Sequence, residues 1–155
     1  MPILDEQRFS FGGPYVYFAD LPKPIILGED LWPKHATYEE HVFFRMSDQL
    51  CDTLCSATRT YLPFAPHDFT QIWDSYDILQ FSREWLFRAQ ILTATSTGNI
   101  RPEIRCLLRS SFYSRMKVDE AAASLHHDLL DTFLFLSGRF HQMAFSKRCL
   151  AIVGY

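Results

Sequence analysis

The chain carries a heavy load of aromatic side chains for its length. Its 155 residues include 14 Phe, 7 Tyr and 3 Trp, so that aromatic residues make up 15% of the chain against 21% charged residues. Each buried ring removes roughly 150–250 Å² from water, and a domain of this size has a limited interior in which to place so many. We therefore expect some of the rings to lie at the surface and to contact another molecule.

Two groups of rings are the best candidates for such contacts. One lies near the N-terminus, and the other lies where bulky apolar residues are adjacent and must fan out around a helix. Tyr, Trp and Phe are typical of the centres of protein interfaces. The expected partner-binding residues are Phe9, Phe11, Tyr15, Tyr17, Trp85, Phe87 and Phe135.

The first 35 residues differ in pattern from the rest of the chain. Short aromatic or β-branched runs at 8–11 and 15–18 flank Gly12–Pro14, which predicts a short β-hairpin. Three later prolines favour extended backbone. We expect residues 1–35 to form an extended N-terminal arm with a possible hairpin, and residues 36–155 to form a helical domain.

Spacings of three and four between apolar residues predict helices in that domain. Thr37-Tyr38-Glu39-Glu40 is typical of a capping box, and an apolar stripe follows it from Phe43 to Tyr61. A second helix is expected after Asp68, which would cap it. The stripe after the capping box is the clearest helical pattern in the chain.

The C-terminal half continues the same pattern. Pro102 suits the first turn of a third helix, and Asp119 suits the start of a fourth that would end at Gly138 in the C′ position. Residues 139–155 would form a fifth helix, or a short helix and a strand at 149–153. The expected fold class is mainly α, a compact bundle of four to five helices.

Basic residues concentrate in the middle of the chain. Residues 81–117 hold seven Lys or Arg, although the net charge of the whole chain is −3. Arg101, Arg105 and Arg109 recur at every fourth residue, so on a helix they would form a ridge. This ridge could pair with acidic residues of the same chain or a second copy, with an acidic protein, or with phosphates of nucleic acid or lipid. The slightly acidic chain favours the first of these.

A cluster of titratable groups suggests a weak candidate for metal binding. His127 and Asp131 are four apart, so on a helix they could bind one cation. The adjacent His127 and Asp128 resemble the metal-binding pair of HD-type phosphohydrolases, whose sites need a further His upstream and an Asp downstream. His41 or His67 could supply the former, but no Asp follows Asp131. A solvated pair on a polar helix face is the simpler interpretation, and we expect no metal or other cofactor.

The four cysteines, Cys51, Cys55, Cys106 and Cys149, are too sparse for a disulfide scaffold. We expect reduced thiols, with Cys51 in the core. The acidic N-terminus has no signal-peptide pattern, and no apolar run is long enough to span a membrane. These features favour an intracellular protein, cytoplasmic or, if a presequence was removed, in an organelle.

Taken together, the sequence favours a non-catalytic interaction or assembly protein, an adaptor or a subunit of a larger complex. Its partner would be another protein, a second copy, or both. One alternative is a helical protein that binds anions, such as RNA or lipid headgroups, through Arg101, Arg105 and Arg109. The other is a small metal-dependent hydrolase centred on His127 and Asp128.

Overall fold

The structure contains a four-stranded antiparallel sheet beside its helices, so the expected bundle of four to five helices is wrong. The computed structural model describes residues 14–29, 31–48, 50–51, 68–94, 106–109 and 112–154. The strands are β1 (Tyr15–Leu21), β2 (Val42–Ser47), β3 (Phe69–Ile72) and β4 (Cys149–Val153). They lie side by side in the order β2-β1-β4-β3.

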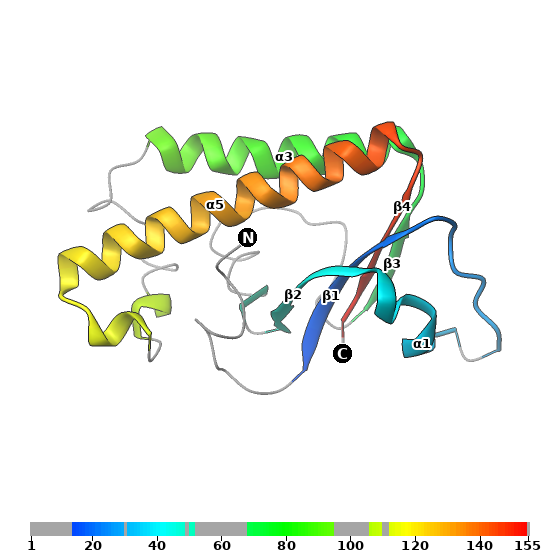
Figure 1. Ribbon diagram of the computed structural model, residues 1–155, viewed down its shortest axis with the longest axis horizontal. Helices are drawn as coiled ribbons and strands as arrows, with labels where there is room; N and C mark the ends of the chain where they lie inside the picture. Colours follow the sequence, from blue (N-terminus) through cyan, green and yellow to red (C-terminus); the bar gives the residue numbers. More distant parts are fainter. Residues whose placement is uncertain are drawn as a thin grey trace.

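Two long helices pack against one another along the top of Figure 1. They are α3 (Ser75–Ala94), which follows β3, and α5 (Val118–Phe145), which returns antiparallel to it and leads into β4. The short helix α1 (His35–Tyr38) and the 3-10 turn η1 (Glu39–His41) precede β2. Two further 3-10 turns, η3 (Cys106–Arg109) and η4 (Tyr113–Arg115), contact α5 near its start.

The sheet is buried on both faces, by different parts of the chain. Its helix-facing side chains pack with α3 and α5 in one large core cluster that includes Phe18, Trp85 and Ile152. The opposite face packs against the segment between β1 and β2, where Tyr38 is fully buried. α3 and α5 therefore each have an inner face in this core cluster and an outer face, with the exposed Leu86 and Leu134, outside it.

β4 confirms the strand that the sequence offered as one alternative for residues 149–153. All five of its residues are buried, because the strand lies between β1 and β3 and is covered on both faces. A short, continuous apolar run of this kind is typical of such a strand. The last strand in the chain therefore occupies the middle of the sheet.

The helix expected after the capping box is wrong for residues 42–47, which form β2, whereas residues 48, 50 and 51 are helical as expected. The Thr37 hydroxyl donates to the carbonyl of Lys34 at 2.5 Å, and the chain enters β2 at Val42. Within β2, Phe44 and Met46 are buried while Arg45 between them is exposed, which is the alternation of a strand. β-branched and aromatic residues fit that environment, and pairing with β1 outweighs the local helical spacing. The rest of the expected helix, residues 52–61, lies outside the described residues.

The second expected helix begins six residues later than the sequence indicated. Residues 69–72 form β3, and Asp74 in place of Asp68 caps α3. Its carboxylate oxygen Oδ1 accepts the backbone N–H groups of Tyr76 at 2.8 Å and Asp77 at 3.2 Å, which are two of the donors that a helix start leaves unpaired.

The helix expected to run from Pro102 to Met116 is not continuous, because its described part consists of η3 and η4. Residues 101–105 lie outside the described residues. The buried residues Leu107 and Tyr113 anchor the two turns on the core, so tertiary packing, not helical periodicity, sets the path of the chain here.

α5 starts as predicted, with Asp119 and Glu120 in its first turn. It does not end at Gly138 but continues to Phe145. The residue in the left-handed conformation after the helix is Lys147, with φ of 53°, and the N–H of Arg148 donates to the carbonyl of Met143 at 3.0 Å. This is the hydrogen bond of a Schellman motif, formed without glycine.

The N-terminal segment is only partly an arm. Residues 15–21 of it form β1, an interior strand that pairs with β2 and β4. The expected second strand of the hairpin is thus present, but its partners are distant in sequence. The expected first strand, residues 8–11, lies outside the described residues.

Candidate functional site

α3 and α5 come into close contact at two serines. The Ser82 hydroxyl donates to the backbone carbonyl of Ser137 at 2.7 Å, and the Ser137 hydroxyl donates to the carbonyl of Ser82 at 2.9 Å. Both residues are buried. Small side chains that bond to the opposite backbone let the two helices approach closely, and they leave little bulk above the contact.

A groove of about 480 Å³ runs along the two helices at this contact. Its floor consists of small residues and its walls of larger ones, and we call it the α3–α5 groove. The groove is lined by Leu79, Ser82, Arg83, Leu86, Leu134, Ser137, Gly138, His141 and Phe145.

The walls of the α3–α5 groove expose apolar surface. Leu86 is 40% exposed, Leu134 48% and Phe145 73%. The ring of Phe145 lies 4.8 Å from the ring of His141, centroid to centroid. Isolated apolar residues at a surface are ordinary, but here they line one concave surface on two adjacent helices, which is the kind of patch that marks an interaction site.

Gly138 lies in the middle of α5, where glycine costs about 1 kcal/mol relative to alanine. A Cβ atom added to Gly138 would meet no heavy atom within 4 Å. The described fold therefore does not require glycine at this position for internal packing. The missing side chain leaves open space on the floor of the groove.

The charged and titratable residues of the groove lining are Arg83 and His141, and no carboxylate lies among the nine residues. Glu84 follows Arg83 but lies about 100° further around the helix and lines a different hollow. The groove is therefore apolar with the positive charge of Arg83 at its rim, which favours a ligand that carries negative charge beside its apolar groups.

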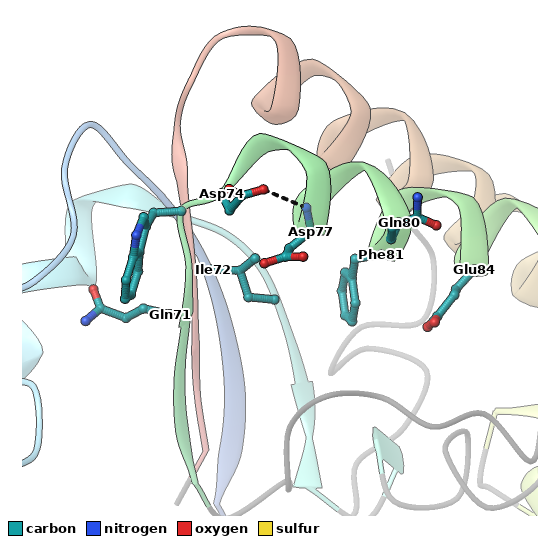
Figure 2. Close-up of a pocket in the computed structure, with 8 residues that line it drawn as sticks. Gln71, Ile72, Asp74, Asp77, Gln80, Phe81 and Glu84 are labelled. Atoms are coloured by element: carbon teal, nitrogen blue, oxygen red, sulfur yellow. Dashed lines mark hydrogen bonds between the residues drawn. The ribbon is translucent and has the colours of Figure 1, made fainter.

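A second hollow, of about 440 Å³, lies on the other side of α3 near its first turns (Figure 2). Asp74, Asp77 and Glu84 line it together with Phe81 and the exposed Trp73. Asp74 already caps α3, as the dashed line in Figure 2 shows. α3 thus lies between a hollow lined by carboxylates and the α3–α5 groove, whose lining contains none.

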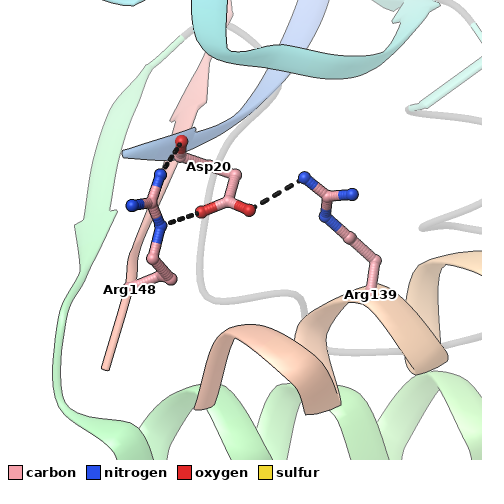
Figure 3. Close-up of polar contacts among 3 residues, drawn as sticks. All are labelled: Asp20, Arg139 and Arg148. Atoms are coloured by element: carbon pink, nitrogen blue, oxygen red, sulfur yellow. Dashed lines mark hydrogen bonds and ion pairs between the residues drawn. The ribbon is translucent and has the colours of Figure 1, made fainter. Parts of the chain in front are cut away.

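An ion-pair cluster fixes the C-terminal end of α5 on the sheet (Figure 3). Asp20 of β1 accepts from Arg139 of α5 at 2.8 Å and from Nε of Arg148, just before β4, at 2.7 Å. Arg148 also donates to the backbone carbonyl of Asp20 at 3.0 Å. Because the Asp20 side chain is only 15% exposed, these charge-assisted bonds are expected to hold α5, and with it one wall of the groove, in a fixed position.

The rings that the sequence put forward as partner contacts occupy different environments. Phe87 on α3 is 61% exposed, whereas Trp85 is 1% exposed with its ring 5.2 Å from that of Phe133. Phe135 is half-buried and packs near Phe44 at a centroid distance of 6.3 Å. Of these three, Phe87 alone presents its ring mainly to solvent.

The N-terminal rings are described in part. Tyr15 and Tyr17 are half-buried on β1. The guanidinium of Arg45 lies 5.4 Å from the ring centre of Tyr15, and the Tyr17 ring lies 6.1 Å from that of Tyr38. Phe9 and Phe11 lie outside the described residues.

The arginine ridge is also described only in part. Arg109 is exposed at the end of η3. Arg101 and Arg105 lie outside the described residues, so the ridge stays a prediction.

The titratable cluster on α5 divides between surface and core. The His127 side chain is 73% exposed, whereas that of Asp128 is 3% exposed; His127 Nδ1 lies 3.7 Å from Asp128 Oδ1. The buried Tyr113 hydroxyl donates to the other carboxylate oxygen of Asp128, so Asp128 anchors η4 to α5. The pair is therefore not fully solvated, in contrast to the simpler interpretation from the sequence. Asp131 is half-buried, and no three His, Cys, Asp or Glu residues in the described part of the chain are arranged to hold a metal ion.

Cys51 and Cys149 are both buried, and Cys51 belongs to the core cluster on the helix side of the sheet, as expected. Burial, with a smaller contribution from the Asp20 carboxylate, raises the pKa of the Cys149 thiol to about 11. A thiol with such a high pKa is a poor nucleophile at neutral pH. Within the described residues, no helix has the length and apolar character needed to cross a bilayer.

The sequence did not identify the groove, although its elements are visible there. Leu86 and Leu134 are the central residues of the triplets 85–87 and 133–135. In these triplets the predicted partner contacts were Trp85, Phe87 and Phe135. Gly138 was interpreted as the end of a helix. The signal that could have found the groove is the presence of Ser82, Ser137 and Gly138 within two helical segments rich in large apolar residues.

Comparison with known proteins gives no relative from which a function could be inferred. A scan against protein-family models, a search of curated proteins and a search of solved structures found no match to this chain.

Proposed function

We propose that the chain is a non-catalytic protein-interaction domain, either an adaptor or a subunit of a larger assembly, and that its partner binds the outer faces of α3 and α5. The observation that carries the proposal is the α3–α5 groove with its exposed walls, Leu86, Leu134 and Phe145. The exposed Phe87 extends the apolar surface along α3.

The packing of the two helices supports this proposal. The inner faces of α3 and α5 already belong to the core cluster, in which Phe81, Trp85, Phe133 and Phe140 are all buried. The exposed apolar residues Leu86, Leu134 and Phe145 of the outer face are therefore outside the core of the described residues. Burial of such residues against a partner contributes about 25 cal/mol per Å² of apolar surface removed from water, before the costs of association are subtracted.

A substitution at Leu134 tests the proposal. The tagged protein and its Leu134→Glu variant are purified from the cells that produce them, and Val118→Glu serves as the matched control. Val118 is also apolar, lies on α5 and is 80% exposed, but does not line the groove. The wild type and Val118→Glu should retain a protein partner in fixed proportion, and Leu134→Glu should lose it.

Circular dichroism and thermal unfolding would first establish that both variants fold like the wild type. A partner that all three proteins retain equally would contradict the proposed surface. If no protein co-purifies with the wild type in fixed proportion, the proposal of an interaction domain is wrong.

A further inference from the structure

We infer that the α3–α5 groove binds an amphipathic helix of a different protein, with a large apolar side chain seated over Gly138 and a carboxylate facing Arg83. This inference rests on the proposed function and specifies the chemistry of the partner. It follows from the dimensions, the lining and the charge of the groove.

The dimensions of the groove suit a helix. On α3 its lining extends from Leu79 to Leu86, about 10 Å at 1.5 Å per residue, and on α5 from Leu134 to Phe145, about 16 Å. Two to three turns of a helix would lie along this length. Apolar side chains at positions i, i+3 or i+4, and i+7 of such a helix would all reach the groove.

The backbone of the groove also favours a helix over an extended peptide. Both walls are helices, whose interior N–H and C=O groups already bond within each helix. The Ser82 and Ser137 hydroxyls bond across the floor. An extended peptide would find no strand edge here to satisfy its own backbone, whereas a helix brings its backbone hydrogen bonds with it.

Gly138 marks where the deepest contact would form. Its absent side chain is not needed for packing within the described fold, yet glycine at this helical position lowers stability. Glycine within a regular element often marks a close approach by a ligand or another backbone. We therefore place the apolar anchor of the partner over Gly138, between Leu134 one turn before it and Phe145 two turns after it on α5.

The charge of the rim selects the partner. Arg83 and His141 border the groove and no acidic residue lines it, so a carboxylate on the flank of the incoming helix would be attracted and a Lys or Arg repelled. In a pairing of two copies groove to groove about a two-fold axis, the groove lining of neither copy would offer a carboxylate to Arg83 of the other. The charges thus favour a different, acidic protein over a second copy.

The test selects ligands without assuming their sequence. A phage library that displays random peptides, long enough for four helical turns, is panned against the purified protein. The selected peptides are synthesised, and their affinities are measured for the wild type, Gly138→Leu, Arg83→Glu and Ala123→Leu. Ala123→Leu is the matched control, because Ala123 is exposed on the same helix and does not line the groove.

We expect selected peptides with apolar residues at helical spacing and at least one Asp or Glu on the flank, and a gain of helical circular dichroism on binding. Gly138→Leu, which fills the floor, should weaken binding by about tenfold or more. Arg83→Glu should weaken it several-fold, with a difference that shrinks in high salt. Ala123→Leu should bind like the wild type.

Other outcomes would overturn the inference. These are no selected peptide, peptides of basic composition, peptides that bind without helix formation, or peptides that bind Gly138→Leu as well as the wild type. A dimer in light scattering that Gly138→Leu abolishes would assign the groove to a second copy. Each of these results is compatible with a protein partner that co-purifies with the wild type and is lost in Leu134→Glu. In that case the proposed function holds, and only the inferred nature of the ligand is wrong.

Discussion

Ser82 of α3 and Ser137 of α5 exchange hydrogen bonds, each hydroxyl donating to the backbone carbonyl of the other residue, at 2.7 and 2.9 Å. The two residues are 55 positions apart in the chain. Their small side chains allow the helices to approach closely, and the same lack of bulk creates the floor of the α3–α5 groove. One local arrangement thus contributes both to packing and to the surface that we propose as the binding site.

The serine pair is expected to contribute measurably to stability. Ser82→Ala and Ser137→Ala should each lower the free energy of unfolding by about 1 kcal/mol, because each removes one buried hydrogen bond. The hydroxyls also lie 3.4 Å apart, so the double variant should deviate from additivity by about 0.5 kcal/mol or more. Denaturant unfolding measures these values, and two neutral single variants would contradict the role of the pair.

Gly138→Ala is expected to stabilise the protein. An added methyl group meets no heavy atom within 4 Å, and alanine is favoured over glycine within a helix by about 0.5–1 kcal/mol. For a chain of this size the midpoint of thermal unfolding should rise by about 1–4 °C. Calorimetry checks this, and a lower midpoint would mean that Gly138 is needed inside the fold and that its open surroundings are not reserved for a partner.

Truncation of a side chain in β4 should lower the free energy of unfolding far more than truncation of a side chain in the groove. Ile152 of β4 is fully buried, whereas Leu134 is 48% exposed. Ile152→Ala should lower the free energy of unfolding by about 2–5 kcal/mol, because it leaves a cavity in the core. Leu134→Ala should change it by about 0.5 kcal/mol or less. Similar losses in denaturant unfolding for both variants would contradict the exposed position of Leu134.

The buried thiol of Cys149 predicts a loss of stability at alkaline pH. Its pKa is raised from 9.0 to about 11 in the folded protein, so between these values the unfolded chain loses the proton while the folded protein keeps it. The free energy of unfolding should therefore fall as pH rises from about 9 to about 11, by at most roughly 3 kcal/mol from this group. Below pH 9 the contribution is fully present.

Cys149→Ala isolates that contribution. Tyrosines and lysines titrate in the same range of pH, but they do so in both proteins, so the difference between wild type and variant reports on the thiol. The difference in unfolding free energy should shrink between pH 9 and pH 11. Parallel curves over this range would contradict the raised pKa of Cys149.

The sequence predicted the elements whose local pattern agrees with their environment. α5 was predicted from Asp119 onward because acidic residues at its start and an apolar stripe beneath it point to the same structure. β4 was one of two predictions for residues 149–153, because a short apolar run fits a strand buried on both faces. In both cases the neighbouring elements reinforce what the chain prefers locally.

The sequence failed where distant partners decide the structure. Residues 42–47 carry apolar spacings that fit a helix, but β1, more than twenty residues earlier, pairs with them in the sheet. The end of α5 was misplaced because Lys147, a residue that rarely adopts φ near 53°, takes the position expected of glycine. The groove depends on which faces of α3 and α5 meet, and helical periodicity alone does not contain that information.

Site-specific photo-crosslinking in the cells that produce the protein tests the central claim most directly. A photoreactive phenylalanine analogue is placed at Leu134 in one variant and at the more exposed control position Val118 in another. We predict that irradiation joins a distinct protein to the chain from position 134 and not from position 118. No adduct from position 134, or the same adducts from both positions, would contradict the assignment of the α3–α5 groove as a binding surface.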